Sequence, residues 1–295
     1  MMEAPRTPSA RISAVVSDVD GTLVTDDKVL TVGAQAAAAE LRTAGIVFAI
    51  ISSRPPRGMR MLLDPLGITT PIGCFNGGVI SSPTLATISE HLLSPEAARR
   101  AVKMLDAQSV RPWVFAGKEW LVRHPDDPYI GREKHTVGFG PTVVEDFRPF
   151  LNNAAKIVGV SADIERLARC EGEMQAGLAG HATTVALSQP YYLDITHSLA
   201  NKGEALSAIA KLLAVPLAEI AVIGDGRNDV AMFKRSGLSI AMGNASPEVK
   251  AAADFVTASN RDDGFAHAVE RFILGGERSN VQVAKVCAGS PHDRP

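Results

Sequence analysis

Continuous apolar runs of strand length alternate along this chain with polar turns and with segments of helical periodicity. Residues 12–16, 46–51 and 220–223 are such runs, and each is followed by a polar or glycine-containing turn. Uninterrupted apolar strands are typical of parallel sheets that are covered on both faces. Residues 31–44 are predicted to form a helix with Thr31 as N-cap, and residues 55–66 a helix that ends at Gly67. The pattern therefore predicts an α/β fold.

Between about residues 82 and 190 this pattern stops. The insert has helical stretches at residues 94–106, 162–170 and 172–179, and strand-like stretches at 111–116, 120–123, 156–160 and 183–187. The strand–helix alternation resumes near Tyr191. We therefore predict a doubly wound, mainly parallel Rossmann-like core (residues 1–81 and 191–274) with an inserted α+β cap domain (residues 82–190). Residues 275–295 are polar and aperiodic, and we expect a loosely ordered tail.

Composition limits the classes of partner. The formal net charge is −2 over 295 residues, so neither nucleic acid nor an anionic membrane is favoured as a partner. Three scattered cysteines provide no disulfide framework, which favours a reducing, cytoplasmic location. No segment has the length and apolarity of a membrane span, and residues 1–11 lack the apolar core of a signal peptide. Composition leaves the oligomeric state open.

Two carboxylates follow the first predicted strand. Asp18 and Asp20 lie two positions apart, so both are expected on the same side of an extended segment. At the carboxyl end of a parallel strand they occupy the edge where open α/β sheets bind ligands. Adjacent anions repel each other, and a hard cation such as Mg²⁺ suits their oxygens. One aspartate can then attack phosphorus while the other handles the proton. By itself, the pair fits a solvated acidic turn equally well.

Three further polar segments follow apolar runs or open helices. Asp225 and Asp229 lie in a glycine turn after the third strand, where they could complete a metal site or simply begin a capped helix. Lys202 opens a helix and could neutralise a phosphoryl oxygen, although a single lysine is usually a surface residue. Ser52 and Ser53 precede the second helix, where hydroxyl and backbone N–H groups form a phosphate cradle or merely an N-cap.

Together, in this order, the segments resemble the haloacid dehalogenase-like phosphohydrolases, and most closely the Cof-type branch, whose large cap follows the second motif. The resemblance extends from about Ile12 to about Leu274. One position departs from the family pattern, because Ser53 stands where a glycine is usual, so its backbone must avoid positive φ or carry a small strain. The matching stretches are residues 17–23, 50–54, 75–80, 201–206, 224–233, 240–245 and 253–257.

The resemblance implies a role for each matched residue. Asp18 would be the nucleophile that forms an aspartyl-phosphate, and Asp20 would protonate the leaving alcohol and later activate water. Mg²⁺ would be held by Asp18, by the main-chain carbonyl of Asp20 and by Asp225, with Asp229 orienting metal-bound water. Lys202 would act in catalysis and in phosphate binding. The remaining phosphate-binding residues would be Ser52, Ser53 and Asn228.

The sequence gives less information about substrate specificity. Arg54 and Asn76 lie near the predicted pocket by motif position, with either a substrate-binding or a structural role. Arg123 and His124 follow a predicted cap strand and are candidate substrate residues. We interpret the chain as a Mg²⁺-dependent phosphatase (a phosphomonoester hydrolase) that acts on a small phosphorylated metabolite such as a sugar phosphate. A sugar-phosphate phosphomutase and a non-catalytic phospho-ligand sensor are the alternatives.

Overall fold

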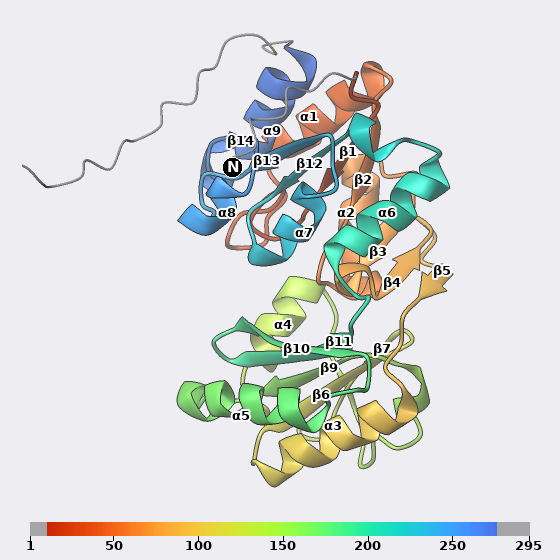
Figure 1. Cartoon of the computed structure of the whole chain (residues 1–295), viewed down its shortest axis with the longest axis vertical. Coiled ribbons are helices and arrows are strands. Elements are labelled where there is room, and N and C mark those ends of the chain that lie inside the picture. The colour runs from red at the N-terminus through yellow and green to blue at the C-terminus, as the bar shows by residue number, and fades with distance from the viewer. Residues whose placement is uncertain (1–10, 276–295) are drawn as a thin grey trace, which may run out of the picture.

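A five-stranded parallel sheet forms the centre of the larger domain (Figure 1). The computed structural model describes residues 11–275. The first strand of the chain is the fourth in the sheet and is buried along its whole length, because apolar elements cover both of its faces. In spatial order the strands are β14 (Phe255–Val256), β13 (Leu238–Ala241), β12 (Ile220–Gly224), β1 (Ala14–Ser17) and β2 (Val47–Ile50).

Helices cover both faces of this sheet, as expected of a doubly wound fold. On one face α6 contributes Leu206 to an apolar cluster, and on the other α1 and α9 contribute Leu41 and Phe265. The Thr31 hydroxyl accepts a bond from the Ala34 N–H and so caps α1. The helices are α1 (Val32–Thr43), α2 (Pro56–Leu66), α6 (Lys202–Leu213), α7 (Val230–Phe233), α8 (Pro247–Ala251) and α9 (Gly264–Ala268), which continues as a π-helix (Val269–Leu274).

A small antiparallel sheet leads from the core to the second domain. It contains β3 (Ile72–Cys74), β4 (Val79–Ser81) and β5 (Thr87–Glu90). Single 3₁₀ turns lie between other elements. They are Phe75–Gly77, Leu151–Asn153, Leu217–Glu219, Arg227–Asp229 and Asn260–Asp262.

The cap is a six-stranded mixed sheet with helices on both sides. Figure 1 shows α4 on the side of the sheet that faces the core, and α3 and α5 on the far side. The helices α3 and α5 and the strands β6, β7, β9 and β10 match predicted stretches of the cap, whereas α4 and β8 were not predicted and β11 was assigned to the core. The strand order is β10 (Thr183–Gln189), β11 (Tyr192–His197), β9 (Ala154–Val160), β6 (Arg111–Ala116), β7 (Glu119–Val122) and β8 (Thr142–Val143); the helices are α3 (Pro95–Ala107), α4 (Ile130–Val137) and α5 (Ile164–Gly177).

The structure corrects both predicted borders of the cap. β5 pairs with β4 in the small sheet, so it belongs to the core side of the border predicted at residue 82. β11 pairs with β9 and β10, so the cap sheet continues to His197, past the border predicted at residue 190. The two helices predicted at residues 162–170 and 172–179 form one helix, because Gly172 lies within α5 without breaking it.

Several further expectations concern particular residues. Ser53 does not adopt a positive φ, so its replacement of glycine carries no left-handed strain. Cys74 and Cys170 are both buried, free thiols. Within residues 11–275 no helix combines the length and the apolarity needed to cross a membrane. The predicted tail, apart from Gly275, lies outside the described residues.

Packing on α6 yields a stability prediction. Leu206 is fully buried against the core sheet, whereas Leu212 on the same helix is 48% exposed. Leu206→Ala should lower the free energy of unfolding by about 2–5 kcal/mol, because it leaves a cavity beside the sheet. Leu212→Ala is the matched control and should change it by less than about 0.5 kcal/mol. Urea denaturation measures both, and equal losses would show that the two positions are not distinguished by packing.

Candidate active site

The carboxyl edge of the core sheet brings three acidic side chains together. Asp18 directly follows β1, and Asp225 and Asp229 follow the neighbouring strand β12. One carboxylate oxygen from each lies within 4.8 Å of the other two. These three residues, which we call the acidic cluster, come from chain segments about two hundred residues apart and meet because β1 and β12 pair in parallel.

A buried lysine connects two members of the acidic cluster. Lys202 is the first residue of α6, whose N-cap Asn201 accepts a bond from the Glu204 N–H. The Lys202 Nζ lies 2.5 Å from Asp18 Oδ1 and 2.5 Å from Asp229 Oδ1. Its side chain is only 1% exposed. Lys202 is therefore a cation enclosed by carboxylates, as its predicted role requires, and not a surface lysine.

Asp229 holds the turn that carries Asp225. Its second oxygen, Oδ2, accepts bonds from the backbone N–H groups of Asp225 and Gly226 at 2.9 and 2.7 Å. With Lys202 on Oδ1, both oxygens of this fully buried carboxylate are already bonded to protein groups. Asp229 therefore positions both Asp225 and Lys202.

Two residues that the sequence did not single out orient Asp225. The Thr22 hydroxyl donates to Asp225 Oδ1 at 3.3 Å, and the Asn244 amide donates to Oδ2 at 3.2 Å. Gly21 leaves room for Asp225, since a Cβ at Gly21 would lie 2.3 Å from Asp225 Oδ2 and the φ of Gly21 is +85°. Thr22 and Asn244 both belong to stretches that match the family, which was the signal available in the sequence.

Two carboxyl groups of the acidic cluster, those of Asp18 and Asp225, hold protons more tightly than free aspartates. Burial, together with the nearby carboxylates, raises the pKa of Asp18 well above its usual value despite Lys202. Burial and the charge of Asp229 raise the pKa of Asp225 to about 6. Burial alone would lower the pKa of Lys202, but Asp18 and Asp229 outweigh it and raise that pKa. The cluster is therefore short of positive charge.

Asp20 lies in a different environment from Asp18. The chain leaves the extended conformation after β1 and turns around the Val19 carbonyl, and the two carboxylates have different cations as partners. Arg54 Nε and Nη2 each donate to Asp20 at 2.8 Å, and Lys28 Nζ lies 2.9 Å from it. Burial alone would raise the pKa of Asp20, but Arg54 and Lys28 lower it to about 2.

In this structure Arg54 therefore positions the carboxylate of Asp20, which is one of the predicted catalytic residues. Lys28, which the sequence did not indicate, does the same from a left-handed position with φ +63°. The Ser52 hydroxyl is buried and accepts a bond from the Arg54 N–H at 3.2 Å. Ser52 and Ser53 follow β2, beside Asp18 after β1, at the edge predicted for the phosphate cradle.

Two predicted asparagines meet each other. The Asn228 amide donates to Asn76 Oδ1 at 3.0 Å and so connects the turn after β12 to the one before β4. Arg123, by contrast, is not brought to the acidic cluster: it pairs with Asp106 on α3 and lies over the Phe147 ring. His124 is exposed on the cap, and its charge acts on nearby Asp127.

The acidic cluster fits a divalent cation. Three carboxylates converge, two of them with raised pKa values, and Lys202 is the cation bonded within the group. Oxygen ligands with excess negative charge suit Mg²⁺. Asp18 and Asp225 would hold the ion, while both Asp229 oxygens are engaged elsewhere. A bound cation would supply positive charge to a phosphoryl group.

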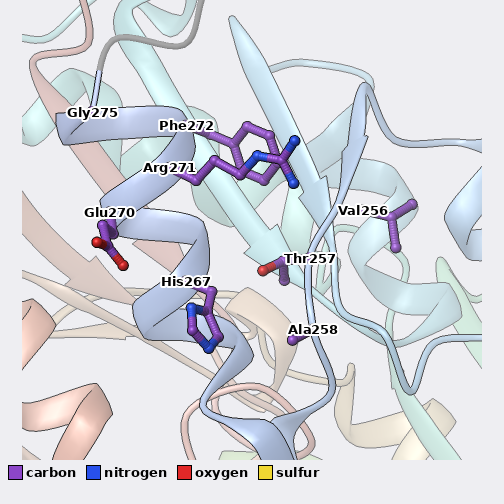
Figure 2. A pocket seen from close by; sticks show the side chains of 8 residues that line it. All are labelled: Val256, Thr257, Ala258, His267, Glu270, Arg271, Phe272 and Gly275. Atoms are coloured by element: carbon purple, nitrogen blue, oxygen red, sulfur yellow. The ribbon is translucent and has the colours of Figure 1, made fainter. Parts of the chain in front are cut away.

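A separate pocket of ≈ 550 Å³ lies at the far edge of the core sheet. Figure 2 shows His267 and Glu270 of the last helix on one side of it and the segment from Val256 to Ala258 on the other. Neither the acidic cluster nor Lys202, Asp20 or Arg54 lines this pocket, so it is separate from the candidate active site.

A buried aspartate–lysine pair with convergent acids, on a parallel sheet with an inserted cap, defines a phosphoryl-transfer enzyme. A family model of haloacid dehalogenase-like hydrolases matches residues 15–269. The chain belongs to this family, and to its Cof-type branch with an inserted cap sheet. It is a phosphatase of small phosphorylated metabolites.

Individual relatives agree with this assignment. The 5-amino-6-(5-phospho-D-ribitylamino)uracil phosphatase YwtE of Bacillus subtilis is 26% identical, over 90% of this chain and 99% of its own. Phosphatase YwpJ of the same organism is also 26% identical, over 88% and 99%. The crystal structure of a haloacid dehalogenase-like hydrolase from Bacteroides thetaiotaomicron has a TM-score of 0.81 and 29% identity, covering 88% of this chain and 99% of its own.

The electrostatics of the acidic cluster yield a prediction about metal binding. Protons compete with Mg²⁺ at Asp225, whose pKa in the folded protein is about 6. That pKa is raised above the unfolded value, so without metal the contribution of Asp225 to stability is present at low pH and is lost as the pH rises through 6. The increase in melting temperature caused by Mg²⁺ should therefore be larger at pH 7.5 than at pH 5.

Thermal denaturation with and without an excess of Mg²⁺, about 10 mM, measures this increase in melting temperature. Asp225→Asn should abolish most of it, and Asp26→Asn, an exposed aspartate paired with Arg261, is the matched control. If the increase in melting temperature did not depend on pH, or persisted in Asp225→Asn, then Asp225 would not be a ligand of the cation.

Proposed function

We propose that the protein is a Mg²⁺-dependent phosphomonoester hydrolase that forms an aspartyl-phosphate on Asp18. The observation that carries the proposal is the buried Asp18–Lys202 pair at the carboxyl end of β1. Lys202 holds the Asp18 carboxylate in place and supplies positive charge where a phosphoryl group would arrive. Asp225, with Asp18, would bind the ion that neutralises the remaining charge.

The reaction would take place in two steps. An Asp18 oxygen attacks phosphorus, the bond from phosphorus to the ester oxygen breaks, and Asp20 gives its proton to the departing alkoxide. Asp20, now a carboxylate, accepts a proton from a water molecule, which attacks the phosphorus of the aspartyl-phosphate. The bond between phosphorus and Asp18 breaks, inorganic phosphate leaves and the Asp18 carboxylate is restored. Ser52 and Lys202 bind the transferring group.

Asp20 is in its base form in the arrangement observed. Arg54 and Lys28 bond both of its oxygens and hold its pKa near 2, so it is ionised at neutral pH. This geometry suits the second step, in which Asp20 accepts a proton. The first step requires a protonated Asp20, and we propose that its contacts with Arg54 and Lys28 loosen when substrate is bound.

The cap would close over the substrate and select the leaving group. The rings of Phe75 in the core and Phe115 in the cap are in edge-to-face contact, with their centroids 5.6 Å apart, so the two domains meet in this structure. We propose a sugar phosphate as the substrate, and the relative YwtE is named for a substrate that carries a phosphorylated ribityl group. We keep the phosphomutase as the second candidate function, tested by assaying the isomerisation of hexose 1-phosphates. The complete set of acids with Lys202 argues against a sensor.

Removal of the nucleophile tests the proposal directly. Asp18→Asn keeps the shape of the side chain but removes the attacking anion, so turnover of p-nitrophenyl phosphate should fall by at least about a hundredfold. The fold should survive, because Lys202 retains Asp229. Activity and melting temperature are measured together, again with Asp26→Asn as control. A folded Asp18→Asn protein with more than about a hundredth of normal turnover would exclude Asp18 as the nucleophile.

The role of Asp20 predicts a dependence on the leaving group. p-Nitrophenolate leaves without a proton, whereas an alkoxide needs one. Asp20→Asn should therefore reduce the rate of phosphoryl transfer at least about tenfold more for an alkyl phosphate than for p-nitrophenyl phosphate, as read from single-turnover release of the alcohol. Equal losses for the two esters would mean that Asp20 does not protonate the leaving group.

A further inference from the structure

The chain passes from the core to the cap and back again through two short crossings (Figure 1). Residues 91–94 lead from β5 into the cap helix α3, and residues 198–201 lead from the cap strand β11 back to α6. A histidine begins the first crossing, and another directly precedes the second. The rings of His91 and His197 are stacked, with their centroids 5.5 Å apart. This histidine pair therefore joins the two crossings.

The imidazole of His197 orders the second crossing. Its Nδ1 accepts a hydrogen bond from the backbone N–H of Leu199 at 3.0 Å. The His197 carbonyl accepts a bond from the Ala200 N–H at 2.9 Å, and the Leu199 carbonyl accepts one from the Asn201 N–H at 2.9 Å. Together these bonds close residues 197–201 into one turn.

This turn ends directly at the lysine of the candidate active site. Asn201 is the N-cap of α6 and Lys202 is its first residue, so the turn sets the point at which the lysine enters the acidic cluster. The turn also packs on the core, because a Cβ at Gly78 would lie 3.3 Å from the Ala200 Cβ. The Gly78 carbonyl in addition accepts a bond from the His91 N–H at 2.7 Å. A shift of the turn would therefore move the ammonium group that pairs with the nucleophile.

The bond from Leu199 requires the neutral form of His197. A protonated imidazole carries a hydrogen on both nitrogens, so Nδ1 would then face the Leu199 N–H as a second donor. Burial, and after it the charge of His91, lowers the pKa of His197 below the 6.5 that is usual for histidine. His197 is therefore neutral at pH 7 and above, with its proton on Nε2.

The surroundings of the histidine pair offer little compensation for a further positive charge. Glu204, in the first turn of α6, interacts with the pair through His91, but it is already paired with Arg235. On the cap side, Thr183 of β10 stands opposite His197 and carries no charge. A proton on His197 would thus add positive charge beside His91 and remove the bond that holds the turn.

We propose that His197 is a positioning residue for Lys202, and that it acts in its neutral form through the hydrogen bond from the Leu199 N–H. When His197 takes up a proton, this bond is lost, the turn before α6 shifts and phosphoryl transfer slows. The inference rests on the proposed function, because His197 acts through the lysine that pairs with the nucleophile.

An asparagine at this position separates the hydrogen bond from the charge. Its side-chain oxygen can accept the N–H two residues further on, but it does not take up a proton. His197→Asn should therefore keep kcat for p-nitrophenyl phosphate within about twofold of normal at pH 7.5, whereas His197→Ala, which removes the acceptor, should lower it at least about fivefold. His267→Asn is the matched control, because His267 is an exposed histidine on α9, away from both crossings.

The pH profile tests the requirement for the neutral form. The kcat/KM of His197→Asn, divided by that of the normal enzyme, should rise at least about threefold from pH 7.5 to pH 5, since only the normal enzyme loses the bond. Titration of the acidic cluster affects both proteins and cancels in this ratio, and the ratio for His267→Asn should stay constant. A constant ratio for His197→Asn would overturn the role of the neutral form. Normal turnover in folded His197→Ala would overturn the positioning role.

The tautomer of His197 is checked without an assay of activity. Long-range ¹H–¹⁵N spectra at pH 7.5 should show an unprotonated Nδ1 for His197, whose signal is the one missing in His197→Asn. A proton on Nδ1 would overturn the inference. If His197→Ala does not fold, the pH ratio and these spectra still decide. Absence of turnover in the normal enzyme would overturn the proposed function, whereas turnover with a constant ratio overturns this inference alone.

Discussion

The ion pair of Lys202 with Asp18 and Asp229 is the contact on which the rest of the site depends. One ammonium group, 1% exposed, lies 2.5 Å from each of two buried carboxylates. Loss of Lys202 would leave two buried carboxylates without their cation, and breaking a buried ion pair in this way typically costs about 3–5 kcal/mol. The pair therefore fixes where α6 begins relative to β1 and β12. Through Asp229 it also fixes the turn that presents Asp225.

The cations of the core are each paired with particular carboxylates. Lys202 lies between Asp18 and Asp229, whereas Arg54 and Lys28 both contact Asp20. Burial and neighbouring carboxylates raise the pKa of Asp18, whereas Arg54 and Lys28 lower the pKa of Asp20. Two aspartates that are two residues apart in the sequence therefore differ in how readily they hold a proton.

The sequence predicted the core well because its signals are local. Apolar strands followed by acids identify the sheet edge, and Asp18, Lys202 and Asp225 meet as expected. The partners of Asp20 were not predicted, because the chain turns at Val19 and Lys28 meets Asp20 only through the fold. In the cap, Arg123 looked like a substrate residue because it is polar and follows a strand, yet its partner Asp106 lies on a helix that no local pattern connects to it. The sequence also did not predict α4, which is only eight residues long.

The order of strands in the core has a consequence for synthesis of the chain on the ribosome. Ala14 pairs with Ile220, so β1 emerges with only β2 available as a neighbour, and its other edge stays open until β12 has been made. The cap sheet, by contrast, is built from one uninterrupted stretch that is complete at His197. Domains fold as units as they leave the ribosome, and an open strand edge invites wrong pairing. The cap is therefore the first part of this molecule able to fold, while β1, which directly precedes Asp18, keeps one edge unpaired until the last third of the chain is being made.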